Sequence, residues 1–95
     1  MFVLDSHCDT PSQIIRLRDL SADNDHAHID FPKLRRGSVD GAFFALYVPS
    51  EMDDLPEEGF SYACRLLDGV NTEIDSNSES VALASSYAEA LKNKD

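Results

Sequence analysis

The sequence has few cysteines, few basic residues and no long apolar run, and each shortage excludes a class of protein. Two cysteines among 95 residues do not make the disulfide framework of a small secreted domain, so reduced thiols in a cytoplasmic protein are expected. With 8 basic against 18 acidic residues, the formal net charge is −10. Such a chain repels phosphate backbones and anionic lipid surfaces, so no nucleic-acid partner is expected.

No apolar run approaches the roughly 18 residues of a transmembrane helix, so no membrane-spanning segment is expected. The first residues, Met-Phe-Val-Leu-Asp, include neither a basic n-region nor a small-residue cleavage site, so no signal peptide is expected. The hydrophobic content of 42% is ordinary for a globular protein and higher than that of a disordered one. These features together favour a folded, cytoplasmic chain.

The most informative stretch lies at the start, where the apolar run Phe2–Leu4 leads into polar residues. A short apolar run followed by a turn signal predicts a buried strand, here at about residues 2–7. Side chains alternate along a strand, so His7 and Asp9 are expected on one face and Cys8 on the other. An imidazole beside a carboxylate is half of a zinc site. The alternative is a histidine at a strand end beside an aspartate that starts a turn.

A second apolar run predicts another strand at about residues 41–48, closed by Pro49. Aromatic and apolar residues occupy both of its faces, as in a strand that is covered on both sides. The chain between the two strands is long enough for a helical crossover, so we expect parallel pairing through a right-handed connection. Tyr47, near the end of this strand, either packs its ring in the interior or contacts a substrate.

Two short helices are expected between the strands. The apolar spacing predicts a helix over residues 12–20, with Ser12 as its N-cap. Asp30 is the expected N-cap of a second helix that ends at Gly37, with Gly37 in the left-handed conformation.

Two further helices are expected in the second half of the chain. Pro56 and two glutamates open the first. Its apolar residues recur at steps of three and four and form one stripe: Phe60, Ala63, Leu66, Leu67, Val70 and Ile74. The polar residues 75–80 end this helix, and a capping-box pattern that begins at Ser86 predicts a last helix that ends at residues 92–94.

The loop before Asp30 contains a second candidate metal-binding pair, His26 and His28. Two histidines separated by one residue can share a metal ion. Loop histidines without Cys or Glu partners are usually solvated, however, and this interpretation is favoured here.

Two motifs together resemble one enzyme family. Residues 5–11, Asp-Ser-His-Cys-Asp-Thr-Pro, resemble the opening D-G-H-N-D-x-P motif of the membrane (renal) dipeptidase family of zinc peptidases. Residues 29–49 resemble that family's second block, a D-L-P-x-L-x-x-G-x-V run that leads into an aromatic strand. The two blocks occur in the family's order. Ser6 stands where the family has a common glycine, and Cys8 where it has a common asparagine.

The resemblance implies an α/β fold in which residues 1–95 are a single partial domain. This domain would be the N-terminal fragment, the first two to three βα units, of a TIM-barrel metallo-dependent hydrolase. A complete barrel of this kind has about 250 residues. The resemblance also implies two zinc ions bridged by a glutamate and by water or hydroxide, with His7 and Asp9 as ligands of one ion.

In the family the bridging glutamate and two further histidines come from later strands, so the fragment alone is expected to be inactive. The complete enzyme would be a metallodipeptidase that hydrolyses the amide bond of a dipeptide, and it could form a homodimer. Two alternatives stay open. One is another metallo-barrel hydrolase of the nuclease or deaminase type, although such enzymes begin with H-x-H and this chain has Asp9 at the second position. The other is a small non-catalytic binding module, which the length and the incomplete ligand set favour.

Overall fold

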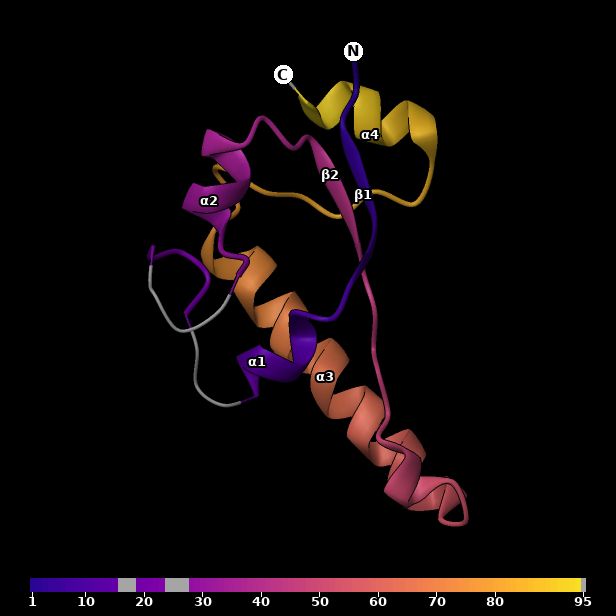
Figure 1. Cartoon of the computed structure of the whole chain (residues 1–95). Coiled ribbons are helices and arrows are strands. Elements are labelled where there is room, and N and C mark those ends of the chain that lie inside the picture. Colours follow the sequence, from indigo (N-terminus) through magenta and orange to yellow (C-terminus); the bar gives the residue numbers. More distant parts are fainter. Residues whose placement is uncertain (16–18, 24–27, 95) are drawn as a thin grey trace.

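The structure is a computed structural model and describes residues 1–15, 19–23 and 28–94 (Figure 1). Within them the sheet consists of β1 (Leu4–Cys8) and β2 (Gly41–Phe44). The helical elements are α1 (Pro11–Ile14), α2 (Phe31–Arg36), the 3-10 helix η1 (Ser50–Met52), α3 (Pro56–Ser76) and α4 (Tyr87–Lys94). Helix and strand are thus mixed along the chain, in agreement with the α/β class.

The two strands pair in parallel, which confirms the prediction. Both differ in extent from the predicted segments, and β2 ends at Phe44 instead of residue 48. A strand pairs only along its partner, and β1 gives way to a turn directly after Cys8. One hydrogen bond continues the ladder beyond β2, from Ala45 N to Cys8 O at 2.8 Å.

The aromatic side chains of the second strand segment are open to solvent. Phe43 is 62% exposed and Tyr47 is 54% exposed. The prediction that both faces of this segment are covered is therefore wrong for the chain as it stands, and so is the packed interpretation of Tyr47. Two strands and the helices around them do not supply enough surface to cover both faces.

The first helix starts earlier than predicted. Pro11 is the first helical residue of α1, and Thr10 takes the N-cap position. The prediction that Ser12 is the N-cap is wrong, because a proline with its fixed φ occupies the first turn more readily. The Ser12 hydroxyl instead donates to Asp9 O at 2.8 Å. The part of the predicted helix at residues 16–18 lies outside the described residues.

Asp30 caps the second helix, α2, as predicted. Its Oδ1 accepts a hydrogen bond from Lys33 N at 2.8 Å, and its Oδ2 accepts one from Lys33 Nζ at 2.6 Å. The carboxylate is fully buried. A buried charge is tolerated only when it is paired and hydrogen-bonded, and Lys33 provides both kinds of contact.

The C-terminal end of α2 differs from the prediction. Gly37 has a φ of −82°, and the following residue, Ser38, takes the left-handed conformation with a φ of 57°. Ser38 N donates to Arg35 O, and Val39 N donates to Leu34 O. This pair of bonds is the Schellman motif, so the left-handed position falls one residue later than the glycine.

The long helix α3 forms one wall of the core. Its first turn contains the proline and the two glutamates, as predicted. Leu66 and Val70 of the apolar stripe are buried, whereas Phe60 near the other end is 73% exposed. Val70 packs with Ile14 and Leu20, and the partly buried side chains around this cluster are Phe31, Phe44 and Ile74. The core therefore lies between α3, α1 and the turn that precedes α2 (Figure 1).

The last helix, α4, crosses the start of the sheet (Figure 1). Ser86 Oγ accepts a hydrogen bond from Glu89 N at 3.1 Å, which confirms one half of the predicted capping box. The reciprocal bond runs from Ser85 N to Glu89 Oε2 at 2.7 Å, one residue earlier than in the usual motif. The Phe2 and Tyr87 rings meet edge to face, with centroids 6.3 Å apart.

At Gly69, α3 packs against Ile14 of α1. A Cβ atom at this position would lie 3.0 Å from Ile14 Cγ2. Replacing Gly69 by Ala is expected to leave the free energy of unfolding unchanged or to lower it. Alanine favours a helix over glycine by about 1 kcal/mol, but the added methyl group would press against a buried side chain.

Gly59→Ala in the same helix is the matched control for Gly69→Ala. Its Cβ would meet Val48 Cγ1 at 3.6 Å, an ordinary contact. This control should raise the free energy of unfolding by about 0.5–1 kcal/mol. Urea unfolding of both variants measures the difference, and an equal gain at the two positions would contradict the close α1–α3 approach.

Candidate metal centre

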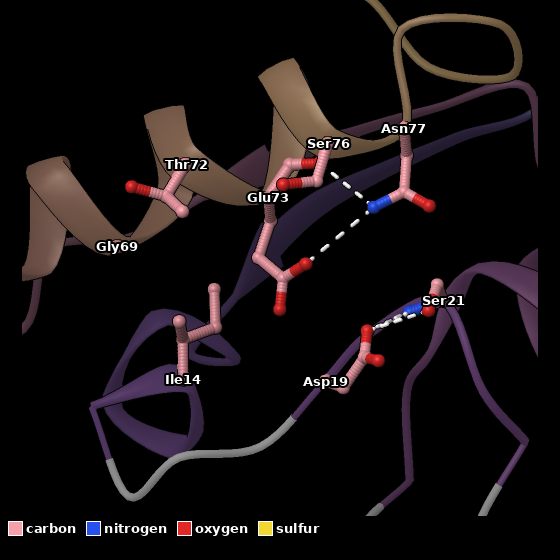
Figure 2. A pocket seen from close by; sticks show the side chains of 8 residues that line it. All are labelled: Ile14, Asp19, Ser21, Gly69, Thr72, Glu73, Ser76 and Asn77. Carbon is pink, nitrogen blue, oxygen red and sulfur yellow. Dashed lines mark hydrogen bonds between the residues drawn. The ribbon is translucent and has the colours of Figure 1, made fainter.

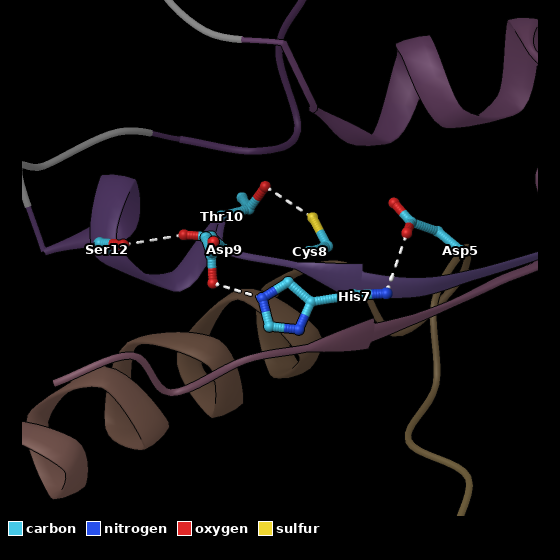
Figure 3. Close-up of polar contacts among 6 residues, drawn as sticks. All are labelled: Asp5, His7, Cys8, Asp9, Thr10 and Ser12. Carbon is cyan, nitrogen blue, oxygen red and sulfur yellow. Dashed lines mark hydrogen bonds and ion pairs between the residues drawn. The ribbon is translucent and has the colours of Figure 1, made fainter.

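A cavity of about 300 Å³ lies where β1 passes into α1. Its lining comes from the strand, from the turn and first helical residues that follow it, and from the segment before α2: Asp5, His7, Cys8, Asp9, Thr10, Gln13, His28 and Ile29. Figure 3 shows the polar contacts that the side chains of the strand end make with one another and with the turn that follows. The carboxyl ends of parallel strands lie at the same edge of a sheet, and the cavity lies at that end of β1.

His7 and Asp9 lie side by side in this cavity. The distance from His7 Nε2 to Asp9 Oδ1 is 3.0 Å, and the two side chains are 70% and 57% exposed. When two donor atoms bind the same tetrahedral zinc ion at about 2.1 Å each, the two atoms lie about 3.4 Å apart. A slight opening of the pair would therefore let one ion sit between the two atoms.

The start of α1 holds Asp9 in place. Asp9 O accepts hydrogen bonds from Ser12 N at 3.2 Å and from the Ser12 hydroxyl at 2.8 Å. These bonds fix the main chain of Asp9 while leaving its Oδ1 directed at His7 (Figure 3).

Cys8 has a different environment from its two neighbours. It is only 6% exposed, and its Sγ lies 3.0 Å from Thr10 Oγ1. Figure 3 shows the sulfur directed at Thr10 and the imidazole of His7 directed at Asp9. Although Cys8 also lines the cavity, its sulfur is engaged in a buried contact of its own.

Sequence reasoning did not identify Asp5 as part of this arrangement. Asp5 Oδ1 accepts a hydrogen bond from His7 N at 3.1 Å. The local signal was available, because an aspartate often accepts a hydrogen bond from the main-chain amide two residues later. The alternating pattern of a regular strand directed attention to the side chains of positions 7 and 9 instead.

The sequence model of one protein family matches residues 1–95, the membrane dipeptidases (peptidase family M19). The chain belongs to the membrane dipeptidase family. No curated protein and no solved structure matches it. The match confirms the family that the motifs at residues 5–11 and 29–49 indicated, and this family consists of peptidases, a class of hydrolase. Despite the family's name, no helix in the described part of this chain is long and apolar enough to cross a membrane.

Membrane dipeptidases depend on zinc, and the His7–Asp9 pair fits that ion in its chemistry. A neutral imidazole nitrogen and a carboxylate oxygen are donors that zinc prefers, and both atoms lie on an accessible cavity wall. Among residues 1–15, 19–23 and 28–94, no group of three or more His, Cys, Asp or Glu side chains could hold a metal ion. Within the described part of this membrane dipeptidase chain, His7 and Asp9 are therefore two candidate donors and not a full set.

The second predicted pair divides between described and undescribed residues. His26 lies outside the described residues. His28 is exposed and lines the same cavity as His7 and Asp9. Among the described residues it does not form a metal-binding group of three with them.

A larger hollow of about 440 Å³ lies between the C-terminal half of α3 and the turn around Leu20 (Figure 2). Glu73 Oε1 accepts a hydrogen bond from Leu20 N at 3.1 Å, and Asn77 Nδ2 donates one to Glu73 O at 2.8 Å. Asp19 accepts hydrogen bonds from the hydroxyl and the main-chain amide of Ser21, and these bonds lower the pKa of the Asp19 carboxyl. The Glu73–Leu20 bond attaches the turn to α3, and the other bonds stabilise the helix end and the turn themselves, so we interpret this hollow as structural.

Asp9→Asn is expected to reduce zinc binding far more than Cys8→Ala in a complete enzyme of this family that includes these residues. The asparagine keeps the size of the side chain but removes the negative charge that faces His7. The alanine removes a sulfur whose contact is with Thr10. Zinc content per chain after dialysis measures both effects. Loss of zinc in Cys8→Ala and retention in Asp9→Asn would contradict the geometry of this strand end.

Proposed function

We propose that this chain is the N-terminal part of a zinc-dependent dipeptidase, in which His7 and Asp9 bind one of two zinc ions. The main support is the distance of 3.0 Å between His7 Nε2 and Asp9 Oδ1 on a cavity wall. The chain that contains this pair belongs to the membrane dipeptidase family. The substrate would be a dipeptide, and the bond cleaved would be its amide.

The complete fold in this proposal is a TIM barrel, with residues 1–95 as one partial domain and β1 and β2 as its first two strands. The parallel pairing of the strands supports it. A further support is that the donors follow the C-terminal end of β1, since TIM-barrel enzymes carry their active sites at that end of the strands. Exposed apolar side chains such as Phe43 and Phe60 would be covered by the remaining barrel.

Bound zinc would polarise the scissile carbonyl group and bring the pKa of a bound water close to neutrality. The role of His7 and Asp9 in this proposal is to bind the zinc ion and to hold it in position. His7 Nε2 lies within hydrogen-bond distance of Asp9 Oδ1, at 3.0 Å. Zinc binding requires the lone pair at Nε2, so the remaining imidazole proton must then be at Nδ1. The bridging glutamate and two further histidines would come from other parts of the complete enzyme.

Assembly and location complete the proposal. The complete enzyme would form a homodimer, as the family resemblance implies. Cys8 and Cys64 are both free thiols in the structure. Free thiols support a reducing compartment such as the cytoplasm.

His7→Ala in the complete protein is expected to lower dipeptide hydrolysis by more than about 100-fold, because losing a ligand should cost more than losing one of its hydrogen-bond partners. His28→Ala is the matched control, because His28 lines the same cavity without belonging to a metal-binding group. The control should stay within about threefold of the parent, as surface substitutions usually do. Steady-state hydrolysis of a dipeptide measures both, and equal losses would contradict the role of His7.

The 95-residue chain by itself is expected to show negligible dipeptidase activity, even with excess zinc. Two donors leave most of the coordination shell to water, and no third donor joins them among the described residues. The same hydrolysis assay on the isolated chain tests this expectation. Turnover that disappears in His7→Ala would contradict it, because the chain would then assemble a working site unaided.

A further inference from the structure

We propose that Asp5 is a positioning residue for the metal centre. Its carboxylate holds the main chain of His7 within a bulge of β1 and thereby sets the direction of the imidazole. This inference rests on the proposed function, because it concerns one of the same two zinc donors.

The strand pairing shows that β1 carries an additional residue. Asp5 lies opposite Ala42, so in a regular parallel ladder the next pair would join His7 to Phe44. Instead Cys8 lies opposite Phe44, and the register shifts between Asp5 and Cys8. Three residue steps on β1 therefore match two steps on β2, which is the definition of a β-bulge.

A bulge removes a main-chain amide from the regular ladder. At His7 the amide finds its acceptor on the same strand, because Asp5 Oδ1 lies 3.1 Å from His7 N. A main-chain amide needs an acceptor when the ladder does not provide one. The Asp5 side chain therefore compensates for the irregularity that the additional residue creates.

The bulge also decides which side chains face the cavity pair. In a regular strand, Asp5 and Cys8 would point to opposite faces. Their partners Ala42 and Phe44 are two residues apart and share a face, so the bulge lets Cys8 turn inward. Cys8 is accordingly buried, and the His7 ring turns outward to Asp9 (Figure 3). The Asp5–His7 hydrogen bond lies within this rearrangement and restrains it.

Asp5 acts through the main chain and not as a third ligand. Asp5, His7 and Asp9 all line the cavity, yet no described group of three such residues could hold a metal ion. The property that matters is therefore the position of the acceptor oxygen two residues before the His7 amide. The negative charge of Asp5 is not required for this task.

Two variants of the complete protein separate acceptor position from charge. Asp5→Asn keeps an oxygen at the position of Oδ1 and removes the charge. Asp5→Glu keeps the charge and moves the oxygens away by one methylene. We expect Asp5→Asn to bind zinc within about threefold of the parent. We expect Asp5→Glu to bind it about 10-fold to 100-fold more weakly, the usual cost of losing a partner that orients a ligand.

Amide hydrogen exchange in the metal-free protein gives a readout that is independent of zinc and of activity. The peptide that contains His7 should exchange faster in Asp5→Glu and at the parental rate in Asp5→Asn. Equal weakening of zinc binding in the two variants would overturn the positioning role, because Asp5→Asn, which keeps the acceptor oxygen, would then be as damaging as Asp5→Glu, which moves it. Parental zinc binding by Asp5→Glu would overturn it as well.

His7→Ala distinguishes a failure of this inference from a failure of the proposed function. Unchanged zinc binding in His7→Ala would overturn both, because His7 would not be a ligand. Zinc binding that is lost in His7→Ala but parental in Asp5→Glu would overturn only the role of Asp5.

Discussion

Parallel pairing between β1 and β2 is the constraint on which the rest of the structure depends. Parallel strands cannot be joined by a tight hairpin, so the chain between them has to cross over, and it does so through α1 and α2. The crossover begins immediately after β1. For this reason the first turn of α1 holds the Asp9 main chain directly after Cys8, where the strand ends. The candidate metal centre is thus a consequence of how the strand becomes a helix.

The packing around this pairing explains which parts of the chain are well covered. Ile14 of α1 reaches α3 at Gly69, and with Leu20 and Val70 it forms the buried cluster beneath the crossover. Apolar side chains outside this cluster remain open to solvent, and Phe43 of β2, for example, is 62% exposed. A chain with a small core and exposed aromatic side chains on its sheet is physically consistent with one segment of a larger barrel, which is the proposed complete fold.

Local patterns were sufficient to predict the strands, their parallel pairing, the Asp30 cap and the amphipathic α3. These features depend on residues close in sequence or on chain length alone. The proximity of His7 and Asp9 also followed from simple alternation. Alternation could not predict the bulge, because the register depends on the partner strand. The left-handed Ser38 was missed because the hydrogen bonds of the helix end, and not the glycine alone, determine where the chain turns.

Zinc anomalous diffraction from crystals of the complete protein would locate the ion directly. The account predicts an anomalous peak at about 2.0–2.2 Å from both His7 Nε2 and Asp9 Oδ1. It also predicts that the Cys8 sulfur remains against Thr10, outside the coordination sphere. A fully occupied zinc site that includes neither His7 nor Asp9, or one that has the Cys8 sulfur as a ligand in their place, would contradict it.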